Sequence, residues 1–235
     1  MEPKQKKEPT TVESAQIEQA SFIHRVFGWM CAGLTVTAIT AYYISATPAL
    51  AEFFIGQSLT FYIILIVELF AVIYLTKAIK NISSTQAGVI FLLYSLFNGF
   101  TFSVIFLIYD IGSIGRVFII TAGTFGFMAL YGYFTKRDLT TVGNLAFFGL
   151  VGLIIASVVN LFSRSSQADL ILAYIGVIIF IALTAYDMQK IKLLNVIGNA
   201  DSDGDKKEAI MGALALYLDF INLFLKLLRI FGKRR

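Results

Sequence analysis

Apolar residues along the chain form long uninterrupted runs, and short polar stretches separate these runs. A helix needs about 20 mainly apolar residues to cross a bilayer. Seven segments approach that length: residues 27–47, 59–76, 88–108, 117–134, 143–162, 170–188 and 209–230. They lack the polar–apolar alternation of barrel strands, and helices satisfy their own backbone groups in lipid. The pattern predicts an all-α integral membrane protein with seven transmembrane helices.

Composition supports the same class. Hydrophobic residues make up 57% of the 235 positions, charged residues only 14%, and the mean hydropathy is +0.78. These values exclude an ordinary soluble enzyme. Residues 1–20 are polar and are expected to be a flexible tail, because they cannot bury enough apolar surface to become ordered. Residues 21–235 are expected to form a single seven-helix domain, whose first apolar run is too long for a cleavable signal peptide.

Basic residues occupy alternate connections between the predicted spans. The N-terminal segment is basic, and the connections after spans two, four and six carry Lys77, Lys80, Lys136, Arg137, Lys190, Lys192, Lys206 and Lys207. The opposite connections hold only Arg116 and Arg164. The positive-inside rule therefore predicts a cytoplasmic N-terminus. Because the basic residues do not interleave with aromatic residues on a polar face, they do not indicate nucleic-acid binding.

The basic C-terminus, residues 233–235, does not fit this alternation. Seven full crossings would place it outside, although its charge favours the cytoplasm. Either the seventh segment is forced across by its neighbours or it re-enters and returns, and the pattern leaves both open.

Three carboxylates lie inside predicted spans, where a charge is costly and usually functional. They are Glu68, Asp187 and Asp219. In the last span a helix would place several residues on one stripe, because they recur at spacings of three and four. The stripe consists of Gly212, Ala215, Asp219, Asn222, Lys226 and Arg229. A helix with this stripe suits the interior of the bundle, so we expect the other six helices to surround it.

Asp187 and Asp219 are the main candidates for function. If the two carboxyl groups meet in the bundle, they would titrate as a coupled pair, and protonation would change which helix contacts are favoured. This hypothesis makes them a pH switch. In the alternative, each acid forms a static ion pair with a basic residue such as Lys190, Lys226 or Arg229. Asn98 in the third span is more typical of a hydrogen bond between helices than of a ligand.

Two weaker motifs were considered. The segment 201–205 (DSDGD) resembles the start of a calcium-binding loop, but Gly212 stands where an EF-hand needs its bidentate glutamate. The pair Tyr186–Asp187 resembles one motif of intramembrane aspartyl proteases, but the second motif is incomplete and lies in a loop. With His24 as the only histidine, the sequence shows no catalytic cluster and no cofactor-binding motif.

The chain resembles the Bax-inhibitor (lifeguard, transmembrane Bax-inhibitor-motif) family, in its small bacterial inner-membrane branch. The resemblance covers about residues 22–235. It is carried by residues 213–224 (ALALYLDFINLF), 227–229 (LLR), 186–189 (YDMQ), 131–133 (YGY) and 136–139 (KRDL).

The resemblance implies seven helices with the last one central, and a pH-sensitive calcium leak. It implies that Asp187 and Asp219 are the pH sensor and gate, with weak calcium binding, and that Glu68 belongs to the ion pathway, to which we add Asn98 and Asn222. Family members can carry an arginine latch after the second span. Here that stretch reads Lys77-Ala78-Ile79-Lys80, so Lys77 or Lys80 is the candidate latch, although a lysine offers a point charge in place of a bidentate fork.

Taken with this resemblance, the residues favour a proton-modulated cation leak in the bacterial inner membrane. A pump is disfavoured because no nucleotide motif is present, and two or three carboxylates fall short of the six to eight oxygen ligands of a tight calcium site. The alternative is a non-transporting regulator that binds other membrane proteins, for example a membrane protease. An intramembrane hydrolase is a distant third.

Overall fold

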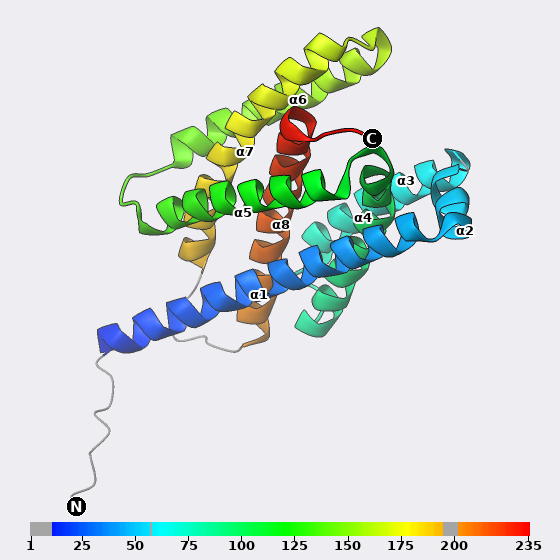
Figure 1. The fold of residues 1–235 in the computed structure, drawn as a ribbon. Coiled ribbons are helices and arrows are strands. Elements are labelled where there is room, and N and C mark those ends of the chain that lie inside the picture. The colour runs from blue at the N-terminus through cyan, green and yellow to red at the C-terminus, as the bar shows by residue number, and fades with distance from the viewer. Residues whose placement is uncertain (1–10, 57, 195–201) are drawn as a thin grey trace, which may run out of the picture.

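The computed structural model describes residues 11–56, 58–194 and 202–235. They form the α-helices α1 (Thr11–Ala46), α2 (Pro48–Ala51), α3 (Ser58–Ala78), α4 (Ser84–Ile108), α5 (Ile111–Phe134), α6 (Thr140–Ser163), α7 (Ser166–Leu194) and α8 (Asp203–Phe231), and one π-helix, η1 (Glu52–Gly56) (Figure 1). Each of the seven predicted segments lies in one of the long helices, apart from residue 47, which follows α1, so the all-α prediction is confirmed.

Six of the long helices are long and apolar enough to cross a bilayer: α1, α4, α5, α6, α7 and α8. The seventh, α3, has 21 residues, or about 31 Å at 1.5 Å per residue. It is not among those six helices. The structure therefore establishes a multi-pass helical membrane protein with six such helices among the described residues, and it has a seventh long helix where the sequence predicts one.

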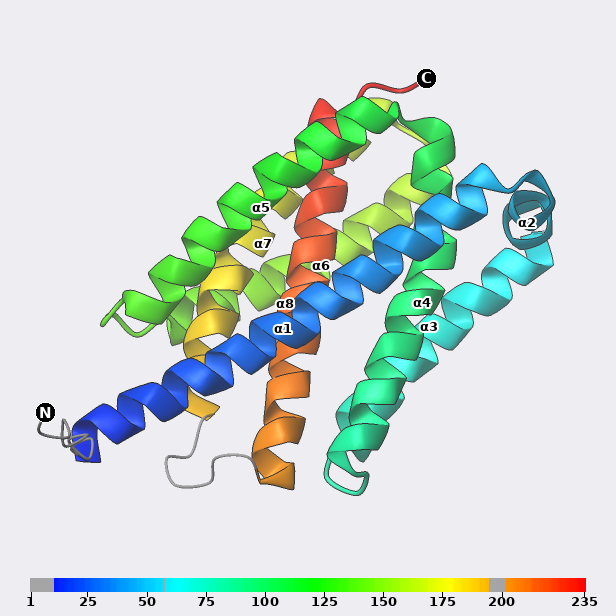
Figure 2. The ribbon, with the colours of Figure 1, turned by 60° about the horizontal axis from the view of Figure 1, so that its bottom comes forward.

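Helix α8 occupies the centre of the bundle, as predicted (Figures 1 and 2). It packs directly on α1, α4, α5 and α7. Helix α3 packs against α4, and α6 packs against α7, so these two form an outer layer. The burial follows this order, since Leu216, Tyr217 and Leu223 of α8 are fully buried whereas α6 exposes most of its apolar side chains.

Helix α1 begins at Thr11, so residues 11–20, expected to be part of a flexible tail, are helical. These residues are polar, but tertiary contacts stabilise the helix that begins with them. Phe22 and Val26 are fully buried, and the Gln19 Nε2 donates to the Lys192 carbonyl at 3.1 Å. With 36 residues, α1 is about 54 Å long and exceeds the hydrocarbon core of a bilayer. The first ten residues of the predicted tail lie outside the described residues.

The two ends of the bundle are distinct. At the first end, the start of α8 meets the α3–α4 connection, where the Ser84 amide donates to the Asp203 Oδ1 at 2.9 Å. The Lys192 Nζ there donates to the Tyr133 carbonyl at 2.9 Å, which joins the last turns of α7 and α5. This end also holds the α5–α6 connection and the N-terminal part of α1.

The second end holds the C-terminus. The Asp110 amide donates to the Lys233 carbonyl at 2.9 Å, and the Arg235 amide donates to the Ile108 carbonyl at 2.9 Å. The segment after α8 is thus tied to the α4–α5 connection. Helix α8 runs from the first end to the second without reversing, so the re-entrant alternative for the last segment is wrong.

Candidate functional site

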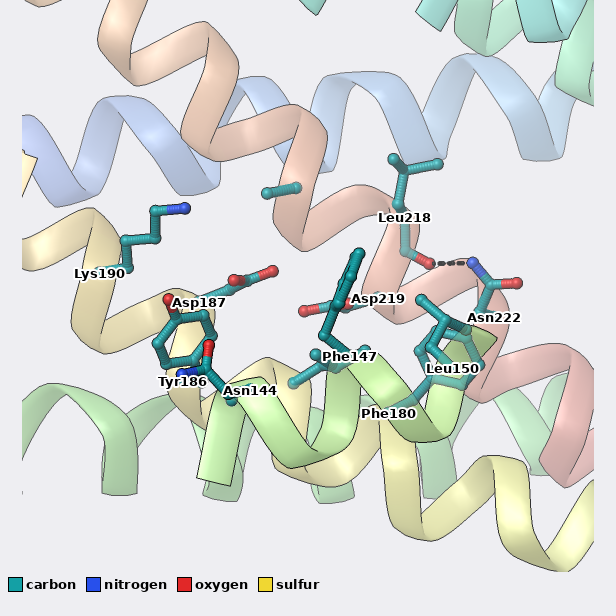
Figure 3. A pocket seen from close by; sticks show the side chains of 13 residues that line it. Asn144, Phe147, Leu150, Phe180, Tyr186, Asp187, Lys190, Leu218, Asp219 and Asn222 are labelled. Carbon is teal, nitrogen blue, oxygen red and sulfur yellow. Dashed lines mark hydrogen bonds between the residues drawn. The ribbon is translucent and has the colours of Figure 1, made fainter. Parts of the chain in front are cut away.

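A cavity of about 500 Å³ lies between α6, α7 and α8 (Figure 3). Its walls combine apolar side chains with a few polar groups, as in binding sites generally. It is lined by Gly143, Asn144, Phe147 and Leu150 of α6, by Phe180, Leu183, Tyr186, Asp187 and Lys190 of α7, and by Ala215, Leu218, Asp219 and Asn222 of α8.

Asp187 and Asp219 both lie in this cavity, and Figure 3 shows their carboxyl groups directed toward each other. Each carboxyl group is close enough to act electrostatically on the other. Asp219 is only 5% exposed, and its Oδ2 has no hydrogen-bond partner within the described part of the chain. The approach of these two acids, expected from sequence, is therefore present. The orphaned oxygen shows that the pair is not a fully satisfied hydrogen-bond network.

Small residues create the space for this site. The stripe on α8 faces α7, because Gly212 meets Ile191, and Asp219 shares the cavity with Asp187. On α6, Gly143 lies against the aromatic ring of Tyr186, and a Cβ there would overlap the ring. The absence of a side chain at Gly143 lets Tyr186 lie against α6 and form one wall of the cavity.

Two amide side chains add polarity to the cavity. Asn222 lies one turn after Asp219, and its Nδ2 donates to the Leu218 carbonyl at 2.8 Å (Figure 3). Asn144 belongs to α6 and lines the same cavity, next to Tyr186 (Figure 3). Asn222 is among the residues predicted from the sequence, whereas Asn144 and Tyr186 are not. The only signal in the sequence was that Asn144 follows Gly143 and that Tyr186 precedes Asp187.

Glu68 and Asn98 do not line this cavity. Glu68 of α3 accepts a hydrogen bond of 2.5 Å from the Thr101 hydroxyl of α4. The Asn98 Nδ2 donates to the Tyr94 carbonyl within α4 at 3.1 Å. Glu68, Thr101 and Asn98 lie on α3 and α4, whereas α6 and α7 supply the cavity wall that faces α8. The sequence alone does not show that Glu68 and Asn98 lie away from the cavity, because it does not say which helices pack together.

The predicted lysine latch has no counterpart in the described residues. Lys77 and Lys80 are exposed at the end of α3 and just after it, and neither forms an ion pair there. The cation that acts on Asp187 is Lys190, which lines the same cavity almost one turn further along α7.

Static ion pairing of the two acids is also not observed among the described residues. Arg229, one of the candidate partners, pairs with Asp169 of α7 instead. Lys190 acts on Asp187 only through space, beyond ion-pair distance.

The site offers few ligands for a metal ion. No group of three or more His, Cys, Asp or Glu side chains that could hold a metal occurs among the described residues. Two carboxyl groups and two amides can contact a passing hard cation but fall short of a tight calcium cage. The described carboxylates of the 201–205 segment are engaged otherwise, since Asp203 pairs with Lys207 at 3.2 Å and Asp205 with Arg25 at 2.5 Å.

Comparisons with known proteins agree with this architecture. Residues 19–235 match the family described as "Inhibitor of apoptosis-promoting Bax1". The chain is 44% identical to the "Inner membrane protein YbhL" of Escherichia coli (strain K12) over 216 residues, which cover 92% of each chain. It is also 44% identical to an uncharacterized protein of Borreliella burgdorferi over 214 residues, covering 91% of this chain and 92% of that one. A 40% identity links it to the uncharacterized protein RP147 of Rickettsia prowazekii over 215 residues, or 91% of this chain and 90% of that one.

Proposed function

The chain belongs to the Bax1-inhibitor family of membrane proteins, and on this premise we propose that it is a pH-sensitive calcium and cation leak channel of the bacterial inner membrane. The activity is passive conduction with no catalysed chemical step and no cofactor. Asp187 and Asp219 are its proton-sensing gate.

The observation that carries the proposal is the meeting of the two carboxyl groups in one cavity of a membrane bundle. Carboxyl groups are rare inside membrane helices, because a charge there is expensive to desolvate. Here two of them come from different helices, and one oxygen of Asp219 is unpaired among the described residues. Such a pair supports a role in proton or cation handling.

The pair can act as a switch through its proton count. When both carboxyl groups are charged they repel each other and attract cations, and a shared proton removes part of that repulsion. The two acids lie on α7 and α8, and α6 closes the third side of the cavity. A change in their charge therefore acts on the contacts among these three helices, which supplies the element that a pH switch must bias.

Weak binding suits a leak better than a pump. A permeating ion must enter a site and leave it again, so a few oxygen ligands serve better than a complete cage. The cavity provides two carboxyl groups and the amides of Asn144 and Asn222. Lys190 in its wall opposes cation entry and gives the pathway a further charge-dependent barrier.

The proposed orientation places the first end in the cytoplasm. That end carries most of the connecting basic residues, and the positive-inside rule assigns such connections to the cytoplasmic side. They are Lys77, Lys80, Lys136, Arg137, Lys190, Lys192, Lys206 and Lys207. The basic C-terminus is then external, held there by its hydrogen bonds to the α4–α5 connection.

Calcium flux into proteoliposomes tests the proposal. The purified wild-type protein and the double variant Asp187→Asn, Asp219→Asn are compared across about pH 6 to pH 8. The wild type should conduct calcium with a clear pH dependence, and the double variant should show a flat profile, because asparagine cannot change charge.

Asp138→Asn is the matched control, since it removes a carboxyl group outside the cavity. Its flux should follow the wild-type profile. An unchanged pH profile in the double variant would refute the gate. No flux above empty liposomes at any pH would refute the leak itself and would favour the regulator that binds other membrane proteins.

A further inference from the structure

A second hollow runs along α6 toward the second end of the bundle. It is an apolar trough of about 320 Å³, lined by Leu150, Leu153, Ile154, Ser157, Val158, Leu161, Phe180, Asn222 and Lys226. Ile154, Val158 and Leu161 are exposed on the outer face of α6, which faces lipid in a membrane protein of this kind. The trough is therefore open to the acyl chains of the bilayer.

One basic side chain, that of Lys226, lines this apolar trough. Lys226 of α8 lays its aliphatic stem against Gly176 of α7, where a Cβ would come within 2.9 Å of three of its carbons. Among the described residues its ammonium makes no hydrogen bond and no ion pair; the nearby Asp169 carboxylate is already paired with Arg229. A glycine that makes room for a lysine stem, and a lysine whose charge is not neutralised by a direct partner, together indicate a site for an external anion.

The trough continues into a wider opening of about 560 Å³ near the second end. Tyr62, Ser157, Asn160, Leu161, Phe162, Arg164 and Asp169 line it. Ser157 and Leu161 belong to both hollows, so the two form one groove. Asp169 is neutralised by Arg229, which leaves Lys226 and Arg164 as the net charge of the groove.

Arg164 occupies this place at a conformational cost. It ends α6 with φ of 52°, in the left-handed region, where its amide donates to the Asn160 carbonyl at 2.8 Å. Glycine or asparagine adopts that conformation more easily. An arginine at a position that favours glycine puts an exposed guanidinium at the mouth of the groove.

We propose that this groove binds an anionic glycerophospholipid of the bilayer, with its phosphate between Lys226 and Arg164 and one acyl chain in the trough along α6. Basic pockets between membrane helices recognise anionic headgroups in this way, and a guanidinium matches a phosphate well. The side-chain amide nitrogen of Asn160, which lines the wider opening, is a further hydrogen-bond donor for the headgroup, whereas the Ser157 hydroxyl already donates to the Leu153 carbonyl.

The groove adjoins the cavity of the two aspartates. Leu150, Phe180 and Asn222 line both the trough and that cavity. An acyl chain in the trough would pack against the same side chains that bound the proposed gate. Lipid control of the leak rests on the proposed function, whereas lipid binding itself does not.

Native mass spectrometry of the intact protein tests the binding. The delipidated protein is offered equal amounts of phosphatidylglycerol and phosphatidylcholine with identical acyl chains. The wild type should retain phosphatidylglycerol preferentially. Lys226→Gln and Arg164→Asn should each lower this preference about fivefold, and the double variant should lose it. Arg164→Asn keeps a residue that tolerates the left-handed backbone, so it tests the charge without disturbing the end of α6.

Two further variants separate the headgroup from the chain. Arg116→Gln removes an exposed cation near the second end, on α5 and outside the groove, and should keep the wild-type preference. Val158→Trp fills the trough and should reduce retention of both lipids. Equal retention of the two lipids by the wild type would overturn the proposal, as would a loss in Arg116→Gln as large as that in Arg164→Asn. Unchanged lipid retention by Val158→Trp would overturn the placement of the chain. These lipid-retention measurements involve no ion flux, so their results do not depend on whether the protein conducts ions.

Discussion

The two faces of α8 differ in how far their buried polar groups are hydrogen-bonded. Toward α1 and α4, the Tyr217 hydroxyl is fully buried and shares a hydrogen bond of 2.7 Å with the Thr37 hydroxyl. Thr37 lies 2.8 Å from the Ser95 carbonyl as well. Toward α6 and α7, the Asp219 Oδ2 is buried without a partner among the described residues and faces Asp187 across a cavity.

Under the proposed function, this difference separates polar groups that hold the helices together from the carboxyl groups of the gate. A satisfied hydroxyl network costs little to bury and fixes how helices meet. An unsatisfied carboxyl group is costly and persists where its charge is used. The face with Tyr217 is also packed by edge-to-face aromatic contacts with Phe91 and Tyr94, at centroid distances of 5.7 and 5.9 Å. We therefore expect mutations on this face to affect stability and those on the face with Asp219 to affect pH dependence.

The largest expected effect comes from removing a ring on the packed face. Phe91→Ala should lower the free energy of unfolding by about 3 kcal/mol, because the fully buried ring leaves a cavity between α1, α4 and α8. Phe147→Ala is the matched control in the aspartate cavity, where the ring is 58% exposed, and should change stability by less than about 0.5 kcal/mol. Thermal unfolding in detergent measures both. Equal losses would remove the contrast between the faces.

A smaller loss is expected when the aspartate cavity is crowded. Gly143→Ala places a methyl group on the Tyr186 ring and should cost about 1–3 kcal/mol, because the ring must move. Gly126→Ala, where a Cβ has nothing within 4 Å, should be neutral or stabilise α5 by up to about 1 kcal/mol through helix propensity. Thermal midpoints of the two variants provide the comparison. A stable Gly143→Ala protein would show that Tyr186 is free to leave the cavity wall.

The direct comparison of the two polar groups uses single-atom changes. Tyr217→Phe should cost about 1 kcal/mol, since it removes one hydrogen bond, and should leave the pH profile of calcium flux unchanged. Asp219→Asn should preserve or raise stability and flatten that profile. Unfolding and liposome flux are measured on the same preparations. A flattened profile in Tyr217→Phe would connect the two faces and contradict their separation.

The smallest effect is expected outside the bundle core, at Asp138 before α6. Its Oδ1 accepts hydrogen bonds from the Thr140 hydroxyl at 2.6 Å and the Thr140 amide at 2.8 Å. These bonds hold the pKa of Asp138 below its usual value, and the bond from the Thr140 hydroxyl has the larger effect. A lowered pKa stabilises the folded state above the unfolded pKa of about 3.9, and this contribution is lost as pH falls through the folded pKa.

Asp138→Ala should therefore lower the thermal midpoint slightly at neutral pH, and the difference from wild type should shrink below about pH 4. Thermal unfolding at the two pH values measures it. A difference that grows on acidification would mean that the charged form of Asp138 does not support the start of α6.

The sequence by itself determined the helical membrane class, the seven long helices and the stripe on α8. Hydrophobic runs and spacings of three and four are local, and a bilayer turns them directly into helices and helix faces. It also singled out Asp187 and Asp219, because an acid in an apolar run is conspicuous wherever the run lies in the fold.

Only the tertiary structure decided which polar residues meet. Glu68 and Asn98 look equivalent to Asp219 in sequence, but they lie on α3 and α4, away from the aspartate cavity. Lys190, Asn144 and Tyr186 form the walls of that cavity, whereas Lys77 and Lys80 lie exposed near the first end. The segment after α8 is joined to the α4–α5 connection at the second end by hydrogen bonds between Asp110 and Lys233 and between Arg235 and Ile108. Neighbours across helices depend on how the helices pack, and residues far apart in the chain carry no local signal of that packing.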